Sequence, residues 1–150
     1  MRGYGDIMDE VMQYINFSVG DQIFALRIDQ VHEIIRMVEV TTVPFGSPEI
    51  RGFASLYGKV VSVVSLRVLL GMPEKEDTSS TRIIVVPYKN GYVPLIVDMV
   101  DSVVTYDRFE EPAEEHRRFM LGVFDKIGFC ADHRAGILNL DVLLGSLVRS

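Results

Sequence analysis

The stretch Ser65-Leu66-Arg67-Val68-Leu69-Leu70-Gly71, near the middle of the chain, returns near its end as Asn139-Leu140-Asp141-Val142-Leu143-Leu144-Gly145. Further segments match in the same order: Gln22–Val31 with Gly91–Val100, and Ile50–Phe53 with Met120–Val123. We interpret this pattern as an internal duplication. A duplicated chain is expected to fold as two similar lobes, with a groove between them and an outer surface on each.

The composition narrows the class of protein. With 150 residues, of which 48% are hydrophobic, the chain is long enough for one packed domain or for two small interlocked lobes. A net charge of −6 argues against binding to nucleic acid through its phosphates. No run of 18 apolar residues is present, so we predict no direct insertion into a membrane. The single cysteine, Cys130, and an N-terminus without an apolar signal core favour a cytoplasmic location.

Short apolar runs separated by turn residues predict a mainly β protein built from two small barrels. Strands are expected at residues 14–19, 23–28, 39–43, 53–56, 59–66, 82–88, 92–97, 102–106, 120–124, 129–132 and 134–140. Short helical turns are expected at residues 30–36, 48–52, 67–70 and 141–148. The polar segment 72–81 is interpreted as a linker between repeat halves at roughly 14–75 and 81–148, with residues 1–13 as a tail.

The sequence offers no catalytic set and no metal-binding pattern. His32, His116 and His133 lie far apart, without partners at the spacing of metal ligands, and the chain has no phosphate-binding loop. We therefore predict a protein that is not an enzyme and needs no cofactor. Asp29 and Asp98 occupy equivalent places in the two repeats, and we expect each to accept hydrogen bonds from the backbone N–H groups of the turn that follows it.

Several motifs, in order, resemble the CheW-like family of chemotaxis coupling proteins. The match covers most of the chain, from about Tyr14 to Leu147. It consists of Phe17-x-x-Gly20, Ala25-Leu26-x-Ile28, Val31-x-Glu33-Ile34-Ile35, Val43-Pro44, Pro48-x-x-Ile50-x-Gly52, Gly58-x-Val60-Val61-x-Val63-Val64-x-Leu66-Arg67, Ile83-Ile84-Val85-Val86 and Val97-Asp98-x-Val100.

The resemblance implies a fold and a role. The fold is two small five-stranded SH3-like β-barrels with short helices, forming a single domain over residues 14–148. The role is that of a non-enzymatic adaptor, which couples the cytoplasmic tips of chemoreceptors to the regulatory domain of a histidine autokinase. Such a protein is cytoplasmic and is recruited to membrane-bound receptor arrays through its partners.

The resemblance also implies partner-binding residues. They are Val31, Glu33, Arg51, Gly52, Tyr57, Val100 and Val103. We expect Glu33, Arg51 and Tyr57 to be exposed at contact surfaces, whereas each of the three valines could equally be part of the core. The family usually has Arg at the position of Tyr57, so either the partner lacks a matching acidic group or the contact here is a stacking one.

A second function class stays open. The chain could be a small-ligand-binding β-barrel protein unrelated to chemotaxis. A pocket lined by Tyr and Phe side chains at the junction of the two lobes would favour that alternative.

Overall fold

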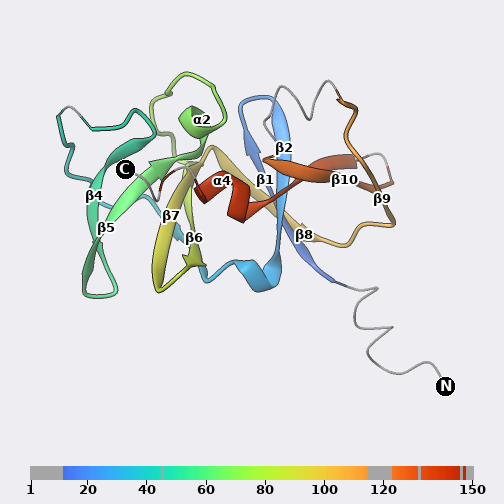
Figure 1. Cartoon of the computed structure of the whole chain (residues 1–150), viewed down its shortest axis with the longest axis horizontal. Helices are drawn as coiled ribbons and strands as arrows, with labels where there is room; N and C mark the ends of the chain where they lie inside the picture. The colour runs from blue at the N-terminus through green and yellow to red at the C-terminus, as the bar shows by residue number, and fades with distance from the viewer. Residues whose placement is uncertain (1–11, 45, 115–122, 132, 146, 148–150) are drawn as a thin grey trace.

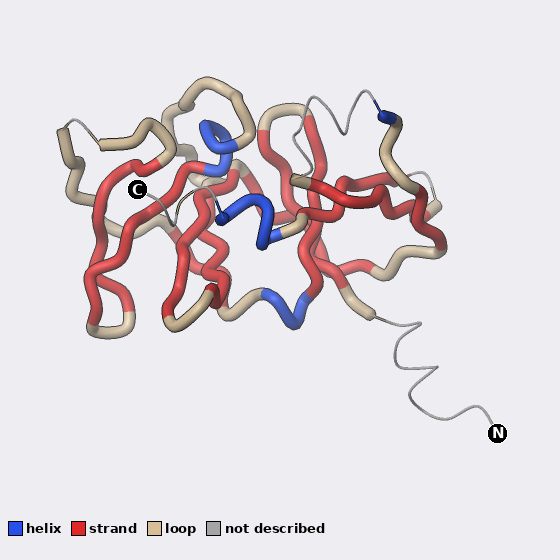
Figure 2. Tube along the Cα trace, in the orientation of Figure 1, coloured by secondary structure: helices blue, strands red, loops and turns tan. Residues whose placement is uncertain are grey.

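The computed structural model describes residues 12–44, 46–114, 123–131, 133–145 and 147, which form mainly β-strands (Figures 1 and 2). The strands are β1 (Tyr14–Val19), β2 (Gln22–Arg27), β3 (Glu33–Arg36), β4 (Ile50–Leu56), β5 (Lys59–Ser65), β6 (Arg82–Tyr88), β7 (Gly91–Val97), β8 (Met99–Val104), β9 (Arg108–Glu110), β10 (Phe124–Cys130) and β11 (His133–Leu138). The helices are short: η1 (Ile28–Gln30), α2 (Leu66–Leu69) and α4 (Leu140–Gly145).

The strands form two sheets that lie next to each other in Figure 1, with α4 in front of their junction. The first sheet has the order β8-β1-β2-β11-β10-β9, and the second has the order β3-β6-β7-β5-β4. The prediction of a mainly β protein with two β units is therefore confirmed. The first sheet has six strands rather than the predicted five, because β9 forms a separate short strand against β10.

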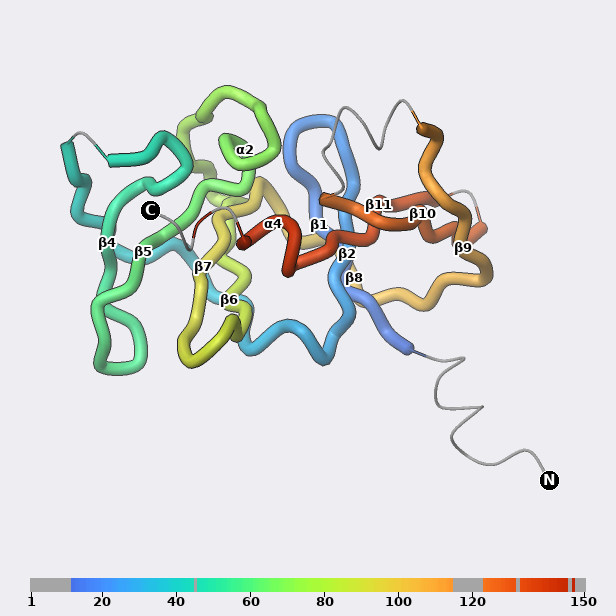
Figure 3. The backbone as a smooth tube through the Cα atoms, in the orientation of Figure 1, coloured from blue at the N-terminus to red at the C-terminus, as the bar shows by residue number. Residues whose placement is uncertain are grey.

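The two halves of the chain exchange strands, as the colours in Figure 3 show. In the first sheet, the hairpin β1–β2 pairs with β8 on one side and with β11 on the other. In the second sheet, the hairpin β6–β7 pairs in the same way with β3 and β5. Each sheet is thus a hairpin from one half completed by strands of the other half, so the two halves interlock.

Both sheets are curled, and one chain segment connects the two edges of each. In the first sheet, the segment that follows β8 reaches β10, where Asp107 N donates to Phe129 O at 2.8 Å. In the second sheet, Thr41 and Phe53 exchange two backbone hydrogen bonds, of 2.8 and 2.9 Å. These contacts are local, and neither sheet is closed by a continuous ladder among the described residues. The predicted barrels are therefore strongly curled open sheets.

Three apolar clusters stabilise this arrangement, and the strand period of two distributes side chains between them. In β2, Phe24 joins a central cluster between the sheets, whereas Ala25 belongs to a cluster of the first sheet alone. In β5, Val64 joins the central cluster and Val63 belongs to a cluster of the second sheet. Leu143 of α4 also lies in the central cluster. Because each fully buried side chain of this kind contributes about 1.5–3 kcal/mol, the central cluster holds the two sheets together.

Two predicted helical turns are wrong. Residues 30–36 form only the end of η1, and Glu33–Arg36 is strand β3, which pairs with β6. The apolar spacing that suggested a helix is decided here by pairing between strands that are distant in the sequence. Residues 48–52 contain a turn at 48–49 and then enter β4 at Ile50. The predicted strand at 120–124 falls largely outside the described residues, as do most of the predicted tail and His116.

Candidate functional site

Three aromatic rings meet at one end of the second sheet. His32 precedes β3, Tyr57 lies in the turn between β4 and β5, and Tyr92 is in β7. The ring centroids are 5.2 Å apart for His32 and Tyr57, 4.5 Å for His32 and Tyr92, and 5.1 Å for Tyr57 and Tyr92. Together with Glu33, which directly follows His32, these residues are called the aromatic cap.

The tight turn between β4 and β5 explains why Tyr57 projects from the protein. Tyr57 has φ 54° and Gly58 has φ 76°, so both central residues adopt the left-handed conformation of a two-residue hairpin turn. Tyr57 is 47% exposed and Tyr92 is 37% exposed. Large rings with this degree of exposure are available for contact with another molecule.

Glu33 and Tyr57 contact each other directly. The Tyr57 hydroxyl donates a hydrogen bond to Glu33 Oε1, although the two residues are 24 positions apart. Partial loss of hydration, together with the neighbouring Glu33 carboxylate, raises the pKa of Tyr57 to about 12. The hydroxyl is therefore a protonated donor at neutral pH. The prediction that both side chains are exposed is confirmed, and the donor to the Glu33 carboxylate is a neutral hydroxyl.

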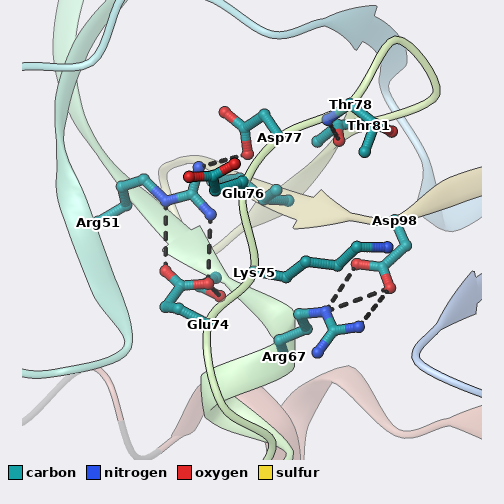
Figure 4. A pocket seen from close by; sticks show the side chains of 11 residues that line it. Arg51, Arg67, Glu74, Lys75, Glu76, Asp77, Thr78, Thr81 and Asp98 are labelled. Carbon is teal, nitrogen blue, oxygen red and sulfur yellow. Dashed lines mark hydrogen bonds and ion pairs between the residues drawn. The ribbon is translucent and has the colours of Figure 1, made fainter.

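Arg51 differs from the prediction. Its side chain is only 21% exposed, and it forms ion pairs with Glu74 at 3.2 Å and with Asp77 at 2.8 Å (Figure 4). The guanidinium of Arg51, which was expected to be exposed, is thus already paired with two carboxylates of the same chain. Its neighbour Gly52 has a structural role, because a Cβ at this position would lie 2.2 Å from the Thr41 carbonyl oxygen. Gly52 therefore permits the close approach that connects the two edges of the second sheet.

The polar segment 72–81 takes part in the same network and is not simply a linker. Glu74 accepts a hydrogen bond from Ser65 Oγ at 2.9 Å, in addition to its ion pair with Arg51. The Pro73 carbonyl accepts one from Arg67 at 3.0 Å. These contacts hold the segment against β4 and α2 (Figure 4).

Asp29 and Asp98 do not share the predicted capping role. Asp98 forms an ion pair with Arg67 at 2.9 Å and accepts a hydrogen bond from Gly20 N at 2.8 Å. Burial opposes the ionisation of Asp98, but the hydrogen bonds from Arg67 and Gly20 outweigh it and lower the pKa of Asp98 from its ordinary value. This carboxylate joins the turn between β1 and β2 to the second sheet. Asp29 forms an exposed ion pair with Arg27 at 2.6 Å instead.

The three valines that could belong either to a contact surface or to the core differ in their exposure to solvent. Val31 and Val100 are half-buried and pack against the central cluster. Val103, in β8 at the edge of the first sheet, is 51% exposed. Among the three, Val103 therefore presents the largest apolar surface to solvent.

Sequence reasoning missed His32 and Tyr92 as members of the aromatic cap. His32 was considered only as a metal ligand, and a strand assignment at 33–36 would have put it at the start of an edge strand. Tyr92 follows the hairpin turn at residues 89–90, and Asn90-Gly91 is a recognisable hairpin signal in the sequence, but nothing local predicts which rings lie beside Tyr92.

A groove of about 720 Å³ lies on the second sheet beside the end of α4. Its lining is largely apolar and includes Phe53, Tyr88, Tyr92, Leu144 and Leu147. Within the described ranges, no three His, Cys, Asp or Glu side chains are grouped so that they could hold a metal ion. Over the same ranges, none of the helices has the length and apolarity needed to cross a membrane.

Comparison with known proteins relates this fold to a family. Residues 13–147 match the family model described as CheW-like domain. The chain is 38% identical over 96 residues to chemotaxis protein CheW of Bacillus subtilis (strain 168), covering 64% of this chain and 62% of that protein. It is 31% identical over 126 residues to the probable chemotaxis protein CheW of Rhizobium etli, covering 79% and 81% of the two chains. The match spans 58% of the length of chemotaxis protein CheW of Helicobacter pylori, so this chain covers less than two thirds of two of these relatives.

A solved structure shows the same architecture. The crystal structure of scaffolding protein TtCheW from Thermoanaerobacter tengcongensis matches with a TM-score of 0.80 and 27% sequence identity, covering 89% of this chain and 92% of that one. The family match extends over almost the whole described fold, including both sheets and the aromatic cap. The chain therefore belongs to the CheW-like domain family.

Proposed function

We propose that this chain is a non-enzymatic adaptor that couples the cytoplasmic tips of chemoreceptors to the regulatory domain of a histidine autokinase in chemotaxis. The relatives named chemotaxis protein CheW and the scaffolding protein TtCheW support this setting. The observation that carries the proposal is the contact between Glu33 and Tyr57 on an exposed surface. This contact supports the proposal because it brings together two residues, 24 positions apart, that the resemblance implies for partner binding.

An adaptor needs separate surfaces for its partners, and an exposed surface on each of the two sheets is consistent with that need. The aromatic cap lies at an end of the second sheet, whereas Val103 is exposed on an edge strand of the first. A signalling contact buries about 800 Å² or less on each partner, which a surface on one sheet can provide. We propose that one partner contacts the cap and the other contacts the β8 surface. The proposed location is the cytoplasm, with recruitment to membrane-bound receptor arrays through these partners.

The test is a binding assay with purified proteins from the same organism: the tagged chain, the kinase regulatory domain and a receptor cytoplasmic fragment. Glu33→Lys and Tyr57→Ala are expected to weaken capture of at least one partner by tenfold or more, because each changes an exposed contact group. Asp125→Lys is the matched control, since Asp125 is an exposed carboxylate on β10 of the first sheet. It makes the same charge change away from the cap and should leave capture intact.

Capture of neither partner by the wild-type chain would refute the coupling role. Equal loss of capture in Glu33→Lys and Asp125→Lys would show a general charge effect and remove the cap from the proposal. Folding of each variant is checked by circular dichroism, so that weaker capture is not confused with unfolding.

The apolar groove favours one alternative, a small-ligand-binding protein unrelated to chemotaxis. A volume of about 720 Å³ lined by Phe53, Tyr88 and Tyr92 is sufficient for a small apolar molecule. The alternative predicts that organic extraction of the purified protein, followed by mass spectrometry, yields one compound in stoichiometric amount. Family membership favours the adaptor, which predicts that no such compound is found.

A further inference from the structure

The carboxylate of Glu33 is held by a neutral group. Its Oε1 accepts from the Tyr57 hydroxyl, and no lysine or arginine in the described chain lies within the 4.0 Å of an ion pair. By contrast, Asp29, Asp77 and Asp98 each have an arginine partner. Glu33 is therefore an exposed carboxylate without an ion pair among the described residues, and its Oε2 accepts no hydrogen bond from them.

The surroundings of this charge are aromatic and apolar. The rings of His32, Tyr57 and Tyr92 lie within 5.2 Å of one another, and Ile34 and Val60 nearby in the sequence are exposed. In Figure 1 the turns that follow β4 and β6 lie at the same lower end of the second sheet. The three rings pack against one another, and Tyr57 and Tyr92 remain 47% and 37% exposed to solvent.

A carboxylate beside exposed aromatic rings fits one side chain better than others. A guanidinium is planar, is always charged, pairs with carboxylates and stacks on aromatic rings. An ammonium can pair with Glu33 but cannot stack as a plane, and an acidic group would be repelled. The chemistry of the cap is therefore complementary to arginine.

We propose that the aromatic cap is a binding site for an arginine side chain of a partner protein, with the guanidinium paired to Glu33 Oε2 and stacked on Tyr57. This inference rests on the proposed function, because it specifies the chemistry of a partner that binds the cap. It also decides between the two possibilities for Tyr57, in favour of stacking, and it gives the partner a basic residue rather than an acidic one.

The site can be probed without any natural partner. The peptide N-acetyl-Leu-Arg-Leu-amide and its citrulline counterpart, which is isosteric and neutral, are titrated into the ¹⁵N-labelled chain. The arginine peptide is expected to shift the amide signals of the cap and to bind about fivefold more tightly than the citrulline peptide. Glu33→Gln should remove that preference, whereas Asp125→Asn on β10 should leave it unchanged. Equal binding of the two peptides, or no shift from either, would overturn the inference.

A second experiment uses the kinase regulatory domain and the receptor fragment. Tyr57→Arg would place a guanidinium of the chain itself next to Glu33, where it would form an intramolecular ion pair with the carboxylate. We expect it to weaken binding of the cap's partner about fivefold, whereas Tyr57→Phe, which keeps the ring, should stay within about twofold. Equal or tighter binding by Tyr57→Arg would overturn the arginine site while leaving the adaptor role intact. Failure of the wild type to bind either protein would instead refute the proposed function. The peptide titration would still test whether the cap binds arginine.

Discussion

Each of the two sheets contains a cluster of three rings, and the clusters differ in what surrounds them. In the first sheet, Tyr14, Tyr106 and Phe109 lie 5.2 to 5.9 Å apart, and the two tyrosines are buried. In the second sheet, the rings of the aromatic cap lie 4.5 to 5.2 Å apart and are exposed. Similar ring clusters thus serve packing in one sheet and remain available for binding in the other.

The polar partners of these rings follow the same division. The Tyr106 hydroxyl donates to Asn16 Oδ1 inside the first sheet, whereas the Tyr57 hydroxyl donates to Glu33 Oε1 at the surface. A buried amide oxygen has no water to replace a lost donor, but an exposed carboxylate does. The first hydrogen bond is therefore expected to stabilise the fold, and the second mainly to orient a surface group.

The largest expected effect comes from adding a Cβ at two glycines, one in each sheet, that lie close to other groups. Gly52→Ala should lower the free energy of unfolding by about 3 kcal/mol or more, because the new Cβ would lie 2.2 Å from a backbone oxygen of Thr41. Gly128→Ala should cost less, about 2 kcal/mol, because its Cβ meets the side chain of Tyr106 at 2.8 Å. Urea denaturation followed by circular dichroism measures both.

Gly91→Ala is the control for these two variants, since a Cβ there would meet nothing within 4 Å. Its expected change is within about 0.5 kcal/mol. An order other than Gly52, then Gly128, then Gly91 would contradict the packing described for the two sheets.

The next largest effect on stability is expected from removing the hydroxyl groups of two tyrosines, one from each ring cluster. Tyr106→Phe should destabilise the protein by about 2 kcal/mol, because Asn16 Oδ1 is left buried without its donor. Tyr57→Phe should change stability by less than about 0.5 kcal/mol, because water replaces the lost bond to Glu33. If Tyr106→Phe is combined with Asn16→Val, part of the loss should be recovered. Equal costs for the two single substitutions would refute the distinction between the clusters.

A smaller effect concerns the contact that joins the two sheets. Asp98→Asn should lower the free energy of unfolding at pH 7 by about 1–2 kcal/mol, because Arg67 and Gly20 lose a charged acceptor. The lowered pKa of Asp98 means that its stabilising contribution is present above the ordinary value of 3.8 and is lost as pH falls further. The difference between wild type and variant should therefore shrink towards about pH 2. A difference that stays constant with pH would contradict this assignment.

The smallest expected effect is a loss of protein stability at alkaline pH. Burial raises the pKa of Tyr106 from 10.0 to about 12, so the folded protein holds this proton more tightly than the unfolded chain does. The resulting stabilisation is complete below pH 10 and is lost as pH rises towards 12. Urea midpoints measured from pH 9 to pH 11 should fall more steeply for wild type than for Tyr106→Phe. Parallel curves would show that Tyr106 does not titrate in this way.

Much of the fold could be predicted from the sequence, because its signals are local. The repeated segments indicated two similar units, and the apolar runs on either side of Tyr57-Gly58 indicated two strands joined by a short turn. The exchange of strands could not be predicted, because β2 carries the same local pattern whether its neighbour is β11 or a strand of its own half. The helical turn predicted at residues 30–36 was wrong for the same reason, since only pairing with β6 makes Glu33–Arg36 a strand.

The candidate site was predicted in part. Exposure of Glu33 and Tyr57 follows from charge and turn geometry, both of which can be recognised locally. The contact between them depends on the curl of the second sheet, and so do the positions of His32 and Tyr92 beside them. The expected exposure of Arg51 was wrong, because its acidic partners come from the segment 72–81, which looked like an unattached linker.

The central claim is that the aromatic cap of the second sheet, and not the ring cluster of the first, is a partner-binding surface. The most direct test is titration of the ¹⁵N-labelled chain with the unlabelled kinase regulatory domain and, separately, with the receptor fragment. The account predicts that one of them shifts or broadens the amide signals of the cap and leaves those of Tyr14, Asn16 and Tyr106 unchanged. Shifts confined to the first sheet with both partners, and an unaffected cap, would contradict it.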